Sequence, residues 1–326
     1  MDAKMTKLRI GRMLSYDWLK IIGLALAAIF VWYFVFTVSA TRITPAQQFT
    51  VVNYFGNTSM SNTELGEKLQ GAFNNKVFSY EVMETSTVDV PMGGDQGYTL
   101  LEARFATSEG DVVFVPNIAD PDSAYEENGE TLYDSYLQKL VKTYGYALYN
   151  LDPNDENGYF KQMETFLNRY YDGGWKNGTL NKAQVENDFR ARITKNKDKR
   201  FKKDDEIAQG IQSEIERIEK YRAGLEEFYG YKDEGLVSFP KTAVYNREDG
   251  SVLREGVFYI NLCPDVSKMG GLKNVAAYAV ENEDGSVKYT AENMCVAFMT
   301  FKDLEESFQY EDLLFVNYLI RQYKSA

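Results

Sequence analysis

The sequence predicts an α/β protein in which one transmembrane helix precedes a folded domain. Residues 21–41 carry no charge and are almost entirely apolar. Residues 49–116 alternate between strand and helix patterns, which is typical of a parallel sheet. Residues from about 121 to 235 favour helix, and strand patterns return after 236. We therefore expect an α/β lobe (49–150), a large helical insertion (151–235) and an α+β C-terminal part (236–326) that completes the lobe.

The apolar segment IIGLALAAIFVWYFVFTVSAT at 21–41 is long enough to cross a bilayer, because about 20 helical residues span roughly 30 Å. Residues 1–20 carry a net charge of +3, so the positive-inside rule places the N-terminus in the cytoplasm. We thus expect a basic cytoplasmic tail (1–20), a transmembrane helix (21–40), a linker (41–48) and an extracellular domain in a single-pass arrangement. The alternative is a signal peptide cleaved after Ala40, although the long apolar stretch and long leader favour an uncleaved anchor.

The first lobe is predicted from hydrophobic spacing. Apolar residues recur every four positions in Ser61–Phe73, which indicates a helix. The run at 111–116 is continuously apolar after Asp111, which suits a strand buried on both faces. The expected elements are a strand at 49–55, a helix at 61–73, a strand at 77–87, a helix at 98–108 and a strand at 111–116. This β-α-β-α-β order predicts parallel pairing with right-handed crossovers.

The rest of the chain is expected to be helical and then mixed. A long charged helix is predicted from about Lys182 to Tyr229. Strand candidates follow at 239–246, 251–262, 274–281 and 294–301. Glu248-Asp249-Gly250 and Glu283-Asp284-Gly285 indicate hairpin turns, and Glu311–Tyr323 is expected to form an amphipathic closing helix.

Three segments of the lobe, FTVVNYFGN (49–57), FSYEVMET (78–85) and YTLLEARFATSEGDVVFVPN (98–117), resemble the first lobe of an extracytoplasmic solute-binding protein, a type II periplasmic-binding-protein-like fold. The likeness covers residues 49–120. It implies a ligand such as a saccharide and a partner such as an ABC transporter permease. Such proteins have two α/β lobes, but the region of the second lobe is helical here. Either an insertion replaced that lobe, or the likeness reflects a common βαβ plan.

Five residues are the candidate ligand-binding set under that resemblance. Tyr54, Asn57, Asn117 and Asp120 follow expected parallel strands at their carboxyl ends, where open α/β sheets bind ligands. Trp175 lies in an aromatic loop, and an aromatic face stacks on a sugar ring. The alternative for each residue is loop capping or ordinary packing.

Composition excludes several chemistries. The chain has no His, which removes His-based triads and metal sites, and its two cysteines form no Cys-x-x-Cys pair. The net charge of −12 argues against nucleic acid as a partner. The acidic loop 152–158 lacks the Gly and Glu positions of an EF-hand. We expect no cofactor, no metal and no enzymatic activity, although a carboxylate-pair hydrolase stays open among 48 acidic residues.

Two further features leave alternatives open. Cys263 and Cys295 either pair outside the cell or remain two buried thiols. Residues 190–203 hold eight basic residues in fourteen, which indicates either contact with polyanions or lipid headgroups, or a solvated helix surface with ion pairs.

The sequence is compatible with two functions: a solute-binding domain, or a non-catalytic envelope scaffold that contacts other proteins. A deep cleft lined by Tyr54, Asn117 and Trp175 would favour solute binding. A filled surface at these residues would favour the scaffold.

Overall fold

The computed structural model describes residues 7–39, 43–44, 47–54, 61–90, 94–127, 129–246, 249–281, 284–301 and 310–325 of the chain. The chain divides into two compact units, Met1–Arg42 and Ile43–Ala326.

The first unit is one helix, α1 (Lys7–Ser39). Within it, the 19 residues Trp18–Phe36 are long and apolar enough to cross a membrane, and none of them is buried in the protein. The predicted apolar helix is therefore confirmed. A membrane anchor and a signal sequence share this property.

A five-stranded mixed sheet organises the second unit, with strand order β10-β13-β3-β1-β2. The central strand β1 pairs in parallel with β2 on one side and with β3 on the other. Strand β13 is antiparallel to β3, and β10 is antiparallel to β13. The strands are β1 (Gln48–Asn53), β2 (Glu84–Asp89), β3 (Val112–Pro116), β10 (Ile260–Asn261) and β13 (Met294–Phe298). The predicted α/β class and the parallel β-α-β-α-β order are confirmed.

Helices cover both faces of this sheet, because successive side chains of β1 point to opposite sides. Val51 packs in one core with Leu65 of α2 (Ser61–Asn74), and Val52 packs in the other with Leu101 of α3 (Gly94–Ala106). The α2 face is completed by α5 (Tyr159–Asn168), α7 (Asp204–Asp233) and α9 (Glu311–Tyr323). The α3 face is completed by α4 (Tyr136–Tyr144). Short helical turns occur at α8 (Val266–Met269), Gly145–Ala147 and Gly270–Asn274. The closing helix α9 has the predicted bounds.

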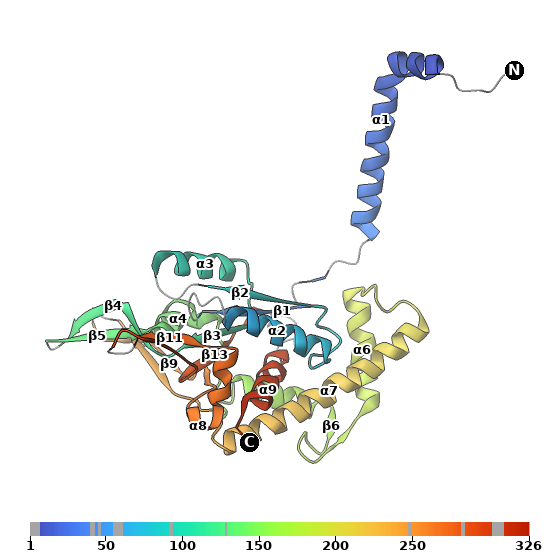
Figure 1. Ribbon diagram of the computed structural model, residues 1–326. Coiled ribbons are helices and arrows are strands. Elements are labelled where there is room, and N and C mark those ends of the chain that lie inside the picture. Colours follow the sequence, from blue (N-terminus) through green and yellow to red (C-terminus); the bar gives the residue numbers. More distant parts are fainter. Residues whose placement is uncertain are drawn as a thin grey trace. The chain divides into compact units, whose positions relative to one another are not determined.

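In the described part of the domain, four two-stranded hairpins lie outside the main sheet, and Figure 1 shows β4 and β5 extending away from it. Gly250 and Gly285 adopt φ of +70° and +76° beside the two predicted turns, which Gly tolerates without strain. Those two hairpins are confirmed. The hairpin strands are β4 (Ala119–Glu127), β5 (Glu130–Ser135), β6 (Tyr171–Asp172), β7 (Thr179–Leu180), β8 (Thr242–Tyr245), β9 (Val252–Gly256), β11 (Tyr278–Glu281) and β12 (Val287–Thr290).

Two sequence predictions about the helical region were wrong. The stretch 119–135 forms the β4–β5 hairpin instead of helix, and the sequence carries an Asn128-Gly129 pair, a strong hairpin signal. The long helix predicted at 182–229 is two helices, α6 (Lys182–Asn196) and α7, joined by a turn at 197–203. The chain turns there because Phe201 packs edge-on against Phe189 at 5.0 Å between ring centroids. A Cβ at Gly210 would lie 2.4 Å from Phe189, so Gly permits this packing.

We call α6, α7 and the turn between them the helical arm. A buried ionic network fixes it to the sheet. Arg217 of α7 is 2% exposed and forms an ion pair with Glu214. Glu214 also accepts from Arg192 at 3.0 Å and from the Tyr80 hydroxyl at 2.8 Å. Arg200 in the turn pairs with Glu81 at 2.7 Å. This network also explains why the predicted strand at 77–87 begins only at Glu84, since residues 79–81 bond to the arm and to α9 instead of to a neighbouring strand.

The pKa values of two buried carboxyl groups in or beside the arm, Glu214 and Glu311, shift in opposite directions. Burial opposes ionisation of Glu214, but Arg217 and Arg192 outweigh it and lower the Glu214 pKa to about 2. Burial raises the pKa of Glu311, which accepts hydrogen bonds from the Ser79 amide at 3.1 Å and the Tyr221 hydroxyl at 2.7 Å.

Candidate functional site

The sequence-predicted site residues do not line one cleft among the described residues. Tyr54 is 1% exposed and packs edge-on against Tyr136 in the core on the α3 face. Trp175 is 5% exposed and lies in the core on the α2 face, with its ring centroid 6.3 Å from that of Tyr229. The sheet therefore separates these two aromatic residues.

The polar members of that set have structural partners. The fully buried Asp120 carboxylate forms an ion pair with Lys139 and accepts from the Asp122 amide at 3.0 Å. Burial, followed by the charge of Asp120, raises the pKa of the neighbouring Tyr136 hydroxyl. Asn117 is partly buried, and its amide donates to the Asn293 carbonyl at 2.9 Å. Asn57 lies outside the described residues. A ligand-binding role for these residues stays a prediction.

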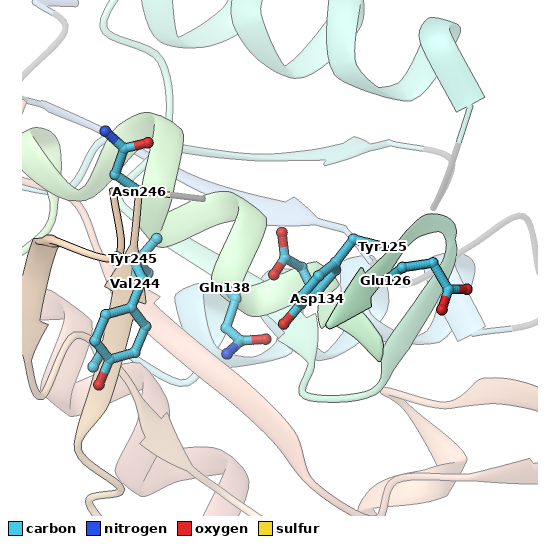
Figure 2. A pocket seen from close by; sticks show the side chains of 9 residues that line it. Tyr125, Glu126, Asp134, Gln138, Val244, Tyr245 and Asn246 are labelled. Carbon is cyan, nitrogen blue, oxygen red and sulfur yellow. The ribbon is translucent and has the colours of Figure 1, made fainter. Parts of the chain in front are cut away.

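A pocket of about 640 Å³ lies between two hairpins and the first turns of α4. This volume falls within the roughly 300–1,000 Å³ typical of small-molecule sites. Figure 2 shows Tyr245 on one side, Tyr125 and Asp134 on the other, and Gln138 between them. We call it the hairpin pocket; its lining residues are Tyr125, Glu126, Asp134, Gln138, Ala243, Val244, Tyr245, Asn246 and Gly250.

Local structure positions Gln138. The β5 strand runs directly into α4, and Ser135 caps that helix in a capping box. The Gln138 amide N–H donates to Ser135 Oγ at 3.0 Å, while Gln138 Oε1 accepts from the Ser135 amide at 2.7 Å. Within the described part of the chain, Gln138 Nε2 has no acceptor, so it stays available as a donor at the pocket.

The opposite wall comes from β8. Successive side chains of a strand point to opposite faces, so Val244 is buried while the next residue, Tyr245, is 54% exposed. The β8–β9 register shifts between these two residues. The Asn246 amide donates to the Ser251 carbonyl at 2.8 Å, which closes the hairpin beside the pocket. The exposed phenol ring is thus held on a short, hydrogen-bonded strand.

The chemistry of the described lining residues suits a ligand rich in hydroxyl groups. Two phenol rings provide apolar faces, and carboxylate and amide groups provide acceptors and donors. The nine described lining residues include carboxylates and amides but no Lys or Arg, the side chains that bind phosphate or carboxylate groups. Sequence reasoning missed this site because it assigned 121–135 to a helix, although Asn128-Gly129 and the predicted turn at Gly250 mark both walls.

A second pocket of about 550 Å³ lies between α7 and the β6–β7 hairpin. Arg222, one of its lining residues, already donates to the Lys176 carbonyl at 2.7 Å and lies 4.8 Å from the Tyr171 ring centroid. Because this guanidinium is engaged within the protein, we regard the hairpin pocket as the stronger candidate.

The cysteines and the acidic loop have structural roles. Cys263 and Cys295 are free and buried in the cores on opposite faces of the sheet, so a disulfide between them is not formed. Burial raises the pKa of Cys263 to about 11. In the loop 152–158, Asp152 accepts from the Asn154 amide and Asp155 from the Asn157 amide, both at 2.9 Å. Among the residues that the structure describes, no cluster of three or more Cys, Asp and Glu residues suited to a metal ion is found.

Comparison with protein-family models, with curated proteins and with solved structures finds no match to this chain.

Proposed function

We propose that this chain is a membrane-anchored, non-catalytic binding protein of the solute-binding type. In this proposal α1 spans the membrane with the N-terminus in the cytoplasm, and the domain from residue 43 onward captures a small solute outside the cell. A saccharide is the proposed ligand class, and an ABC transporter permease is the proposed partner.

The observation that carries the binding function is the hairpin pocket. A pyranose ring presents C–H groups to an aromatic face and hydroxyl groups around its rim. Tyr125 and Tyr245 provide faces for the ring, while Asp134 and Gln138 provide an acceptor and a donor for hydroxyl groups. The parallel β2-β1-β3 core is consistent with the resemblance to a solute-binding lobe, but a βαβ plan serves many functions.

A thermal-shift screen of the full chain in detergent tests the binding function. We expect a saccharide to raise the melting temperature, because a ligand that binds only the folded state stabilises it by mass action. The shift should be lost in Tyr245→Ala and kept in Tyr289→Ala, since Tyr289 is 50% exposed but lies on the β11–β12 hairpin away from the pocket lining. A saccharide shift that survives Tyr245→Ala would place the site elsewhere.

Sequencing the N-terminus of the mature protein tests the anchor. An uncleaved chain beginning at Met1 or Asp2 supports it, whereas a chain that begins at Thr41 would mean that a signal peptide was removed.

The alternative function is a non-catalytic envelope scaffold. The filled interior around Tyr54 and Trp175 favours it, as do exposed apolar residues on two hairpins: Tyr245, Val252 and Leu253 on β8–β9, and Val287 and Tyr289 on β11–β12. No thermal shift with any solute, combined with capture of a defined envelope partner that Val287→Ser and Tyr289→Ser abolish, would favour the scaffold.

A further inference from the structure

We propose that the turn of the helical arm docks the domain onto the surface of an anionic membrane. The docking element is a group of four lysines that we call the lysine turn: Lys195, Lys197, Lys199 and Lys202. This inference goes beyond solute binding and rests on the proposal that α1 is the membrane anchor.

The structure divides the eight basic residues of 190–203 into two groups. Arg192 and Arg200 point inward and pair with Glu214 and Glu81. Arg190 pairs with Glu186 at 2.8 Å, and Lys203 lies 3.6 Å from Glu206. The four residues of the lysine turn are exposed, and their ammonium groups form no ion pair or hydrogen bond within the described part of the chain. The interpretation as a surface laced with ion pairs therefore holds for the arginines and leaves these four lysines unexplained.

Nearby acidic groups are largely engaged. Asp198 accepts from Arg200 at 2.7 Å, and Glu206 accepts from the backbone amides of Lys202 and Lys203 at 2.9 and 3.0 Å. Asp204 and Asp205 occupy the first turn of α7, where negative side chains complement the helix dipole. The lysine ammonium groups thus keep their charge available to an external partner.

The lysine turn lies near the point where the chain enters the domain. The Arg200 guanidinium contacts Glu81 at 2.7 Å, and two residues later the Met83 amide donates to the Gln47 carbonyl at 2.8 Å. Gln47 immediately precedes β1. This chain of contacts places the lysine turn within about 20 Å of the start of β1.

The length of the linker brings that point close to the membrane. Only residues 40–47 separate the end of α1 at Ser39 from β1 at Gln48, and such a segment extends at most about 30 Å. The remaining domain is strongly acidic, since residues 1–20 carry +3 of a total charge of −12. An anionic bilayer would repel the acidic surface and attract the lysine turn, so the field would orient the domain. A bilayer surface is therefore the occupant that charge and linker length favour.

Energy transfer in reconstituted full-length protein tests this docking. A donor dye is attached at Asn196→Cys, an exposed position at the end of α6, while the native cysteines are buried. Nanodiscs contain phosphatidylcholine with 0 or 30% phosphatidylglycerol and a headgroup-linked acceptor. We expect transfer efficiency to rise about twofold with phosphatidylglycerol and to return to the lower value in 0.5 M NaCl, because salt screens the attraction. A donor at Val287→Cys on β12 should show no rise.

Charge-removing variants make the test specific. Replacing the lysine turn with glutamine (K195Q/K197Q/K199Q/K202Q) should abolish the rise. The matched variant K142Q/K182Q/K273Q/K288Q, which removes four exposed lysines elsewhere, should keep it. Docking is refuted if efficiency does not depend on phosphatidylglycerol, if both variants behave alike, or if the lysine turn binds soluble polyphosphate while ignoring the bilayer. Failure of the chain to insert into nanodiscs would refute the anchor itself, a separate outcome.

Discussion

The helical arm and the hairpin pocket are held in the same domain by different forces. The arm is fixed by buried charges, with Arg217 and Glu214 paired inside the protein and Arg200 bonded to Glu81. The pocket walls are short hairpins that carry the exposed Tyr245 and border a cavity of about 640 Å³. Elements held by buried networks adopt one arrangement, whereas short hairpins with few buried contacts are the parts that open most easily. We therefore expect the arm to be rigid and the hairpins to adjust to a bound ligand.

The largest expected effect comes from breaking the arm's central ion pair. Arg217→Met leaves the buried Glu214 charge without its main partner, so we expect a loss of roughly 3–5 kcal/mol in the free energy of unfolding. Urea denaturation of the full chain in detergent measures it. The double variant E214L/R217M removes both charges and should recover most of the loss. If the single variant is as stable as the wild type, the network does not hold the arm.

Acid should also weaken the arm. The folded-state pKa of Glu214 is lowered to about 2, below the ordinary glutamate value of 4.5, so its stabilisation is present above about pH 4.5 and is lost as the pH falls toward 2. Glu311, whose pKa burial raises, acts in the opposite sense, because its ionisation opposes folding as the pH rises. Urea denaturation at pH 7, 4.5, 3 and 2 measures how the free energy of unfolding depends on pH. Below pH 4.5, the free energy of unfolding should fall less steeply with decreasing pH in E214L/R217M than in the wild type. An unchanged dependence on pH would contradict the proposal that Glu214 causes the loss of stability in acid.

Two glycines of α7 provide a smaller, matched test of the arm's packing. A Cβ at Gly224 would lie 2.7 Å from Leu314 of α9, whereas one at Gly230 would meet nothing within 4 Å. Gly224→Ala should cost about 1–2 kcal/mol through overpacking, and Gly230→Ala should gain about 0.5–1 kcal/mol from helix propensity. Equal effects of the two substitutions on the urea midpoint would show that α7 and α9 are not tightly packed.

The smallest effect on stability is expected at the pocket. Tyr245→Ala removes a ring that is 54% exposed, so the free energy of unfolding should change by less than about 0.5 kcal/mol. A loss above 2 kcal/mol in thermal denaturation would mean that this ring supports the fold and is not displayed for a ligand.

The sequence predicted the lobe better than the pocket, for physical reasons. Helix and strand periodicity within 49–116 and 311–323 depends on burial against one sheet, so local patterns were enough to assign β1, α2, α3, β3 and α9. The turn between α6 and α7 depends on Phe201 packing against Phe189, a contact that no local pattern shows. The start of β2 at Glu84 likewise depends on Glu81 bonding to Arg200, 119 residues away in sequence.

The site was harder to predict because strand ends do not specify which side chains are exposed. Tyr54 immediately follows β1, as expected, but its ring is buried in the core against Tyr136. Asp120 follows β3 but is neutralised by Lys139, a residue on the later helix α4. The hairpin pocket joins residues more than 100 positions apart, Tyr125 and Tyr245, so only the folded chain brings them together.

Equilibrium binding to the reconstituted chain tests the central claim most directly. Isothermal titration of the full-length protein in nanodiscs with the saccharide selected by thermal shift should give one site per chain. Tyr245→Ala should weaken that binding at least tenfold, and Tyr289→Ala should leave it unchanged. Binding that is equally strong in Tyr245→Ala, or no binding of any saccharide by the folded wild-type chain, would contradict capture of a saccharide in the hairpin pocket.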